Sequence, residues 1–239
     1  MSVSDQYGRL KGAEWFSSLY KRDILVLGAG GIGSWLSLFL SRIGANLYIY
    51  DMDLYEEHNM SGQAVTKSSI GTLKTVAIKQ LIEKFSPDCE VSLGGEYTSE
   101  SMTNDIVLCG FDNMKARKVA FLRWKAFVED NVGFSNEEYE EKRRTSFFMD
   151  GRLNAEHLQI FSIRGDDKEA IKKYEKEHLF DDSEVEEQDC TFKQTTHCAA
   201  MIASKMVSFL VNWGYNIKVS PIRTVPFFYE YFPPINYTS

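Results

Sequence analysis

The first residues whose type and spacing indicate chemistry are the glycines of the stretch LGAGGIGSWL, which are Gly28, Gly30, Gly31 and Gly33. They lie between the apolar run 24–27 and an apolar stretch of helical periodicity, so they predict a tight turn from a strand into a helix. Glycine lets the backbone come close to a phosphate, and the start of a helix offers unpaired N–H groups and the positive end of its dipole. The turn therefore predicts a phosphate-binding site, although a tight turn without a ligand would have the same sequence.

Asp51 is the next candidate, because it lies 18 residues after Gly33, where the apolar run of a second strand stops. An acidic residue at this distance accepts hydrogen bonds from the hydroxyls of a ribose. The glycine turn and Asp51 fit an enzyme that uses a dinucleotide and an enzyme that uses ATP equally well. These features by themselves do not choose between the two.

A β-α-β unit is needed to position these residues. The strand at 24–28 and the helix at 33–43 are followed by a second strand in NLYIYDMD that ends at Asp51. Further periodic segments predict helices at 74–85 and 116–129 and strands within 89–98 and 105–113. The C-terminal half predicts two strands in 145–164 joined by a turn at Gly151, a charged helix and loop over 166–189, a helix over 194–213 that ends at Gly214, and edge strands after Pro221. We therefore expect an α/β fold, with a doubly wound, Rossmann-like, mostly parallel sheet and a C-terminal antiparallel extension.

Length and composition set the outer limits. A chain of 239 residues with 44% hydrophobic and 26% charged residues is typical of one globular domain, and we expect a single domain over 1–239. No apolar run approaches the roughly 18 residues of a membrane span, and the start lacks the layout of a signal peptide, so we expect a cytoplasmic protein that does not enter a membrane. The formal net charge of −7 argues against nonspecific nucleic-acid binding, although such a total can include a local basic patch, and we expect no nucleic-acid partner. None of the four cysteines forms a C-x-x-C pair, and we expect no zinc.

A further set of residues follows the glycine turn in a fixed order, and it separates the two nucleotide classes. The set consists of the D-x-D pair Asp51 and Asp53, then Asn59 and Gln63, then Gly71 and Lys74, then Asp112 and Asn113. With the turn, this ordered set resembles the ThiF/MoeB/HesA superfamily, the adenylyltransferases related to ubiquitin-activating enzymes. The resemblance covers about residues 7–125.

The resemblance implies a site for ATP and Mg²⁺. Asp51 would bind the ribose, Asn59 and Lys74 would contact the phosphates, and Asp112 would help to hold Mg²⁺. The other expected ATP-binding residues are Gly28, Gly30, Gly31, Gly33, Asp53, Gln63 and Asn113. Attack of a carboxylate on the α-phosphate builds negative charge that a lysine and Mg²⁺ neutralise while pyrophosphate leaves. The implied function is activation of the C-terminal carboxylate of a small ubiquitin-like protein or peptide as an acyl adenylate.

One position departs from the family pattern and keeps other functions open. Where the family has an arginine just before the glutamine, this chain has Gly62, so a phosphate contact is missing or Arg117 or another residue supplies it. Because of Gly62, a noncatalytic nucleotide-binding subunit of a heterodimer remains an alternative. A Rossmann oxidoreductase that uses NAD is the other, and Lys74 with Asp112 argues against it, since hydride transfer needs no pyrophosphate clamp.

Two segments outside this set carry weaker signals by resemblance. DQYGRLKG, in an N-terminal arm over 1–22, is similar to the family segment whose arginine reaches the ATP site of the partner subunit. Arg9 is therefore either a catalytic residue of a homodimer or a plain surface arginine. The charged segment 166–189 stands where the family carries a crossover loop over the adenylate, and its acidity could equally serve solubility alone.

Cys190 follows this segment, and Thr191 comes after it as in the Cys-Thr pair of ubiquitin-activating enzymes. A cysteine at this point attacks the adenylate in some family members, so Cys190 is a candidate nucleophile for a thioester, with a structural cysteine as the alternative. Cys198, by contrast, has the surroundings of a small buried hydrophobic residue. Asp150 and Arg152 could face the site from the end of a strand, but we expect a hairpin turn that Asp-Gly stabilises.

Overall fold

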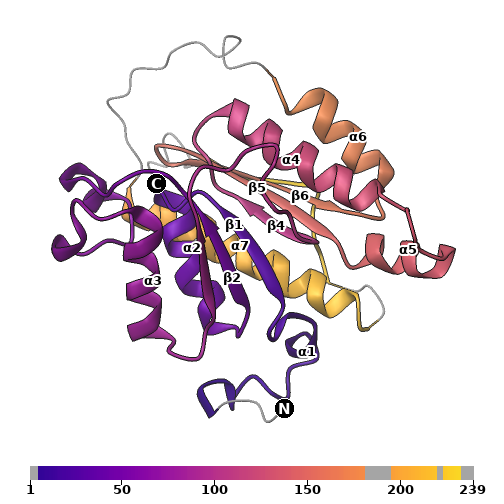
Figure 1. Cartoon of the computed structure of the whole chain (residues 1–239), viewed down its shortest axis with the longest axis horizontal. Coiled ribbons are helices and arrows are strands. Elements are labelled where there is room, and N and C mark those ends of the chain that lie inside the picture. The colour runs from indigo at the N-terminus through magenta and orange to yellow at the C-terminus, as the bar shows by residue number, and fades with distance from the viewer. Residues whose placement is uncertain (1–4, 181–194, 220–222, 233–239) are drawn as a thin grey trace, which may run out of the picture.

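The computed structural model describes residues 5–180, 195–219 and 223–232, which form one sheet with helices on both faces (Figure 1). The sheet has seven strands in the order β3-β2-β1-β4-β5-β6-β7. The strands from β3 to β5 in this order pair in parallel, and β6 and β7 continue the sheet antiparallel. The strands are β1 (Asp23–Leu27), β2 (Asn46–Tyr50), β3 (Val91–Gly94), β4 (Ile106–Cys109), β5 (Phe147–Asn154), β6 (His157–Arg164) and β7 (Phe228–Tyr231). The predicted fold class is confirmed.

Each face of the sheet is covered by its own helices. On one face lie α2 (Gly31–Arg42), α3 (Lys74–Phe85) and α7 (Thr196–Asn216), and on the other lie α4 (Met114–Glu129) and α6 (Lys168–Glu177). The shorter elements are α1 (Phe16–Leu19), α5 (Asn136–Arg144) and the 3-10 helices Asp5–Tyr7, Glu57–Ser61 and Lys67–Ser69. Within β1, Ile24 and Val26 pack into the α2 and α7 face, whereas Leu25 and Leu27 pack into the α4 and α6 face. A strand that is buried on both faces must be apolar throughout, which explains the unbroken apolar runs of β1 and β4.

The topology determines where a ligand can bind. β1 lies in the middle, with β2 on one side and β4 on the other, so the loops that leave β1 and β4 run in opposite directions. A crevice opens at such a switch point, outside the carboxyl ends of the strands. The glycine turn, Asp51 and Asp112 follow the ends of β1, β2 and β4 respectively.

Two predicted boundaries in the C-terminal half are wrong. The turn expected at Gly151 lies inside β5, and the hairpin instead reverses after Asn154, where Ala155 has a φ of 53°. Asp-Gly usually marks a turn, but here Asp150 is fully buried and a Cβ at Gly151 would lie only 2.7 Å from Met206 Sδ. Likewise α7 continues past Gly214 to Asn216, because Gly214 packs against Leu19 rather than ending the helix.

The described parts of the N-terminal arm and of the charged segment pack on the domain. Tyr7 is buried and donates a hydrogen bond to the carbonyl of Ser41 over 3.2 Å. In the charged segment, α6 buries Ala170, Ile171 and Tyr174, so its helix is not merely solvated, while residues 181–189 lie outside the described part of the chain. Among the described residues no helix combines the length and apolar character needed to span a membrane.

The carboxylate of Asp150 is the most deeply buried charge of the sheet. It pairs with Arg117, accepts a hydrogen bond from Arg152 Nε over 2.7 Å, and accepts another from the Tyr174 hydroxyl over 2.8 Å. Burial alone would raise the pKa of Asp150, but the two arginines and the hydrogen bonds from Arg152 and Tyr174 outweigh it, so the pKa lies below its usual value. Asp150 is therefore an anion at neutral pH. It forms a buried ion cluster with Arg117 and Arg152 at the position where the sequence predicted a turn.

Replacing Asp150 with asparagine should lower the free energy of unfolding by about 3–5 kcal/mol near neutral pH, because it leaves buried arginine charge uncompensated. Since the folded pKa is depressed, the contribution is present above the unfolded carboxyl pKa and is lost as the pH falls through the folded value. The difference between wild type and variant should therefore shrink in acid. Urea unfolding across this pH range checks the trend, and Asp166→Asn, at an exposed ion pair with Arg164, is the control and should cost under about 1 kcal/mol. A constant difference at all pH values would contradict the assignment.

Candidate active site

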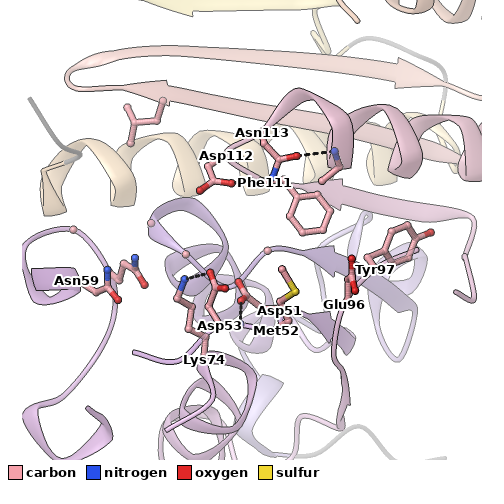
Figure 2. A pocket seen from close by; sticks show the side chains of 18 of the residues that line it. Asp51, Met52, Asp53, Asn59, Lys74, Glu96, Tyr97, Phe111, Asp112 and Asn113 are labelled. Atoms are coloured by element: carbon pink, nitrogen blue, oxygen red, sulfur yellow. Dashed lines mark hydrogen bonds and ion pairs between the residues drawn. The ribbon is translucent and has the colours of Figure 1, made fainter. Parts of the chain in front are cut away.

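A cavity of about 900 Å³ opens at the carboxyl ends of β1, β2 and β4, and Figure 2 shows its wall from close by. It brings together ten of the residues singled out from the sequence, namely Gly28, Gly30, Gly31, Asp51, Asp53, Asn59, Gln63, Lys74, Asp112 and Asn113. Gly33 lies behind the turn and outside the lining, and so does Arg9. Cys190 falls outside the described residues. The volume is within the range of ligand pockets, and polar groups converge on it from separate elements.

The glycines of the turn, Gly28, Gly30 and Gly33, have different structural roles. Gly28 has a φ of +92°, which side chains other than glycine rarely adopt, and a Cβ there would lie 3.1 Å from the carbonyl oxygen of Gly110. A Cβ at Gly33 would lie 1.7 Å from the carbonyl oxygen of Gly28, so Gly33 allows α2 to pack against the turn. Gly30 has no atom within 4 Å of its Cβ position. Gly33 is thus needed for the fold, whereas Gly30 keeps space open beside the start of α2.

Because the two glycines have different surroundings, replacement by alanine should have different effects at Gly33 and at Gly30. Gly33→Ala should lower the free energy of unfolding by several kcal/mol, because backbone has to move. Gly30→Ala should leave the melting temperature unchanged and weaken nucleotide binding by about tenfold, because the methyl group occupies the space where backbone and phosphate approach. Thermal unfolding and calorimetry on both variants check this. Unimpaired nucleotide binding by Gly30→Ala would show that the turn does not hold the phosphates.

Asp51 lies at the end of β2 with both carboxylate oxygens oriented by backbone. Its Oδ2 accepts from the Ala29 amide over 2.7 Å and its Oδ1 accepts from the Asp53 amide over 2.9 Å. Burial raises the pKa of Asp51, and these two hydrogen bonds together with nearby Lys74 oppose the rise. A carboxylate oxygen can accept more than one hydrogen bond, so each oxygen retains capacity for a ribose hydroxyl.

Lys74 begins α3 and extends into the cavity from below in Figure 2. Its Nζ pairs with Asp53 Oδ2 over 2.8 Å, and its amide donates to the Asp53 carbonyl over 2.9 Å. The Lys74 side chain is 11% exposed while that of Asp53 is 58% exposed, so the lysine is held in the wall and its partner faces solvent. This ion pair holds the ammonium group of Lys74 at the wall of the cavity.

Asp112 lies on the opposite side of the cavity from Lys74, in the turn between β4 and α4 (Figure 2). Its neighbour Asn113 is the N-cap of α4, since Asn113 Oδ1 accepts from the Ala116 amide over 2.8 Å. Asn113 Nδ2 also donates to Asp112 Oδ1 over 3.2 Å. Asn113 therefore fixes the turn, and Asp112 presents an exposed carboxylate to the cavity.

These residues fit Mg²⁺ only together with a nucleotide. Within the described part of the chain, no group of three or more His, Cys, Asp or Glu side chains could hold a metal ion. Mg²⁺, however, is commonly bound through one or two carboxylates plus substrate phosphates and water. Asp112 provides such a carboxylate at the edge of a cavity that has room for phosphates.

The segment after β2 supplies amide side chains. Asn59 Oδ1 accepts from the Glu56 amide over 2.9 Å, so the carbonyl side of Asn59 stabilises the 3-10 helix Glu57–Ser61. Gln63 Oε1 is buried, and the described residues offer it no hydrogen-bond partner. A buried acceptor without a partner is costly, and a ligand or water that donates to it would remove that cost. Gly62 lines the cavity beside it, with its carbonyl bound to Trp35 Nε1 over 3.0 Å.

The suggestion that Arg117 replaces the missing family arginine is not supported by the structure. Arg117 is buried behind the cavity wall, where it binds Asp150 and the carbonyl oxygens of Phe111 and Gly151. It does not line the cavity, because the buried carboxylate of Asp150 holds it in the interior.

Sequence analysis also missed parts of the wall. Phe111, the loop 95–99 with Glu96 and Tyr97, and the hairpin tip 153–155 all line the cavity. The loop 95–99 and the hairpin tip 153–155 carried no motif, and Phe111 was missed although it directly precedes Asp112. Lys115 lines it too, and its position three residues after Asp112 in the first turn of α4 was the only available signal.

The fold and the site together define the class of protein. A family model described as the ThiF family matches residues 4–124, and the chain belongs to this family. The family assignment confirms the resemblance that the ordered motifs indicated.

Individual relatives are more distant. The chain is 32% identical to the tRNA threonylcarbamoyladenosine dehydratase of Haemophilus influenzae over 107 residues, which are 44% of this chain and 41% of that protein. It is 28% identical to the ATP-dependent ubiquitin transferase-like protein Cap2 of Enterobacter hormaechei over 120 residues, 46% of this chain and 20% of that protein. The chain thus matches less than half the length of these relatives.

Solved structures resemble the whole domain. The crystal structure of PaaA superposes with a TM-score of 0.67 at 13% identity, covering 91% of this chain and 68% of that one. The structure of E. coli MccB with ATP superposes with a TM-score of 0.63 at 16% identity, covering 92% and 66%. At these identities the likeness establishes the shared fold.

Proposed function

We propose that this protein binds ATP with Mg²⁺ and adenylates the C-terminal carboxylate of a peptide or a small ubiquitin-like protein. The observation that carries the proposal is the placement of Lys74 and Asp112 on opposite sides of one cavity, which the glycine turn and Asp51 also line. Hydride transfer would have no use for this pair of charges, which disfavours an oxidoreductase that uses NAD.

The residues have distinct roles in the proposed reaction. The backbone of the glycine turn and the start of α2 bind phosphate, and Asp51 accepts hydrogen bonds from the ribose. A carboxylate oxygen of the substrate forms a bond to the α-phosphorus while the bond to the pyrophosphate oxygen breaks, giving an acyl adenylate and pyrophosphate. Lys74 moves from Asp53 to the phosphates and neutralises the charge that builds on them. Mg²⁺, bound through Asp112, would add positive charge at the phosphates.

The net charge of the chain favours a peptide over a nucleic acid as the second substrate, whereas the relatives include both kinds. MccB has been crystallised with ATP and with the peptide MccA, and the relative from Haemophilus influenzae acts on tRNA. This chain has a formal net charge of −7, which would repel a nucleic acid. A peptide or protein carboxylate is therefore the substrate class that we infer.

Exchange of labelled pyrophosphate into ATP tests this function. A panel of peptides with free C-termini is compared with the same peptides amidated, which lack the attacking oxygen. At least one free peptide should support exchange, and its amidated form should not. Calorimetry measures the affinities for ATP and for NAD in the same experiment series. Tight binding of NAD without binding of ATP would contradict the proposal. ATP binding without exchange for any carboxylate would favour the noncatalytic subunit that Gly62 keeps open.

Two further roles belong to the same proposal. Arg9 is exposed and lies outside the cavity of its own chain, which is compatible with action in the site of a second copy in a homodimer. If it acts there, mixing Arg9→Ala with Lys74→Ala subunits should restore part of the activity, and no recovery in proven mixed dimers would count against it.

For Cys190, a thiol-sensitive adduct with the acyl substrate should form in wild type and be absent from Cys190→Ala. An adduct that survives in the variant would exclude this cysteine as the nucleophile.

A further inference from the structure

Arg117 connects the turn that carries Asp112 to the buried ion cluster of β5. Its Nη2 donates to the carbonyl of Phe111, the residue immediately before Asp112. Its Nη1 donates to Asp150 and, over 3.0 Å, to the carbonyl of Gly151. One guanidinium thus joins the end of β4 to the middle of β5.

Asp150 holds a second arginine that does not reach the turn. Arg152 Nε binds Asp150 Oδ2 over 2.7 Å, and Arg152 Nη2 binds the carbonyl of His178 at the end of α6 over 2.7 Å. The two arginines are both buried or nearly so and share one carboxylate, yet only Arg117 contacts the Asp112 turn. Arg152 is therefore a matched control within the same cluster.

The contact with the Phe111 carbonyl bears on the direction of the Asp112 side chain. The peptide plane between these residues is rigid, so fixing its carbonyl toward Arg117 restricts how the next residue can orient. The other bonds of the turn hold its two ends, since Gly110 N donates to the Leu27 carbonyl and Asn113 caps α4. Arg117 fixes the middle of this turn through its hydrogen bond to the Phe111 carbonyl. A charged donor in a site shielded from water makes a stronger bond than a neutral one.

We infer that Arg117, oriented by Asp150, is a positioning residue that holds Asp112 toward the phosphates and their metal ion. This inference rests on the proposed function, because it assigns to Asp112 the task of binding Mg²⁺ with ATP. It also explains why a charged cluster is buried inside the sheet directly behind the cavity wall.

The test compares Arg117→Lys with Arg152→Lys, since both keep a positive charge beside Asp150 and only the first removes the guanidinium that holds Phe111. Hydrogen exchange of the whole 239-residue chain without nucleotide reports on the turn itself. In Arg117→Lys the amides of Gly110, Ala116 and position 117 should exchange about tenfold faster than in wild type, because their hydrogen bonds depend on a fixed turn. In Arg152→Lys they should exchange at the wild-type rate.

Calorimetry then measures ATP affinity with Mg²⁺ and with a chelator. The ratio of the two affinities reports the coupling between metal and nucleotide, which partial unfolding would not change. The ratio should fall by at least about fivefold in Arg117→Lys, toward the value of Asp112→Asn, and stay at the wild-type value in Arg152→Lys. Should Arg117→Lys not fold, Arg117→Gln leaves Asp150 paired with Arg152 and answers the same question.

The outcomes separate the inference from the proposed function. Unchanged exchange at the turn in Arg117→Lys, equal changes in both variants, or an unchanged affinity ratio would each overturn the positioning role. Normal ATP binding by wild type beside such a result would leave the proposed function standing. A wild type that does not bind ATP would contradict the proposed function and, with it, the metal-binding task of Asp112, while hydrogen exchange would still show whether Arg117 holds the turn.

Discussion

Replacing Lys74 with alanine should lower the rate of pyrophosphate exchange by roughly 10²- to 10³-fold, the loss seen when one preorganised charge or donor is removed from a transition state. Lys74 is held in the cavity wall by Asp53, and no other lysine of α3 lines the cavity. Its ammonium group is therefore the charge that we expect to follow the leaving pyrophosphate. The assay uses the peptide that supports the highest exchange by wild type.

The matched control for this change is Lys84→Ala, which removes an exposed lysine in the last turn of the same helix. It should retain full exchange and unfold at nearly the wild-type temperature, because exposed charges contribute little to stability. Exchange by Lys74→Ala at the wild-type rate would remove this residue from the site.

Replacing Asp112 with asparagine should have a comparable effect on exchange and a specific effect on its metal dependence. Asparagine keeps the shape of the side chain but loses the negative charge that attracts Mg²⁺, so exchange should fall by about 10²-fold and saturate at higher Mg²⁺ concentration. A titration of exchange rate against Mg²⁺ measures both. Asp130→Asn, at the far end of α4, should behave as wild type.

A variant Asp112→Asn with unchanged Mg²⁺ dependence would contradict the role of this carboxylate. The metal would then have to be held by the phosphates and by residues on another part of the wall. Glu96 is one alternative, since it lies on the cavity wall and carries a carboxylate.

The sequence predicted the local parts of this architecture well, because their signals are short-range. The glycine turn, the second strand ending at Asp51 and the helix Lys74–Phe85 each follow from the periodicity and chain breakers of a single segment. Parallel strands place their carboxyl ends along one edge of a sheet, and this brought residues as far apart as Gly28 and Asp112 into one cavity.

Features that depend on contacts between distant segments could not be predicted from these short-range sequence patterns. Asp150 and Gly151 have turn chemistry by local rules, yet Arg117 and Arg152 bind the carboxylate inside a strand. For the same reason Arg117 could not be recognised as an interior residue. α5 was also missed, because its charged sequence has little apolar periodicity, although Ser135 and Glu138 form a capping box that marks its start.

Transfer of ¹⁸O from the substrate carboxylate to AMP tests the central claim most directly. The active peptide, labelled in its C-terminal carboxylate, is incubated with ATP, Mg²⁺ and hydroxylamine, and the AMP is examined by mass spectrometry. An acyl adenylate keeps one carboxylate oxygen bound to phosphorus, and attack of hydroxylamine on its carbonyl carbon releases that oxygen with AMP. The account predicts AMP that carries one ¹⁸O atom, together with pyrophosphate and the peptide hydroxamate. Unlabelled AMP, or ADP with labelled phosphate, would contradict it.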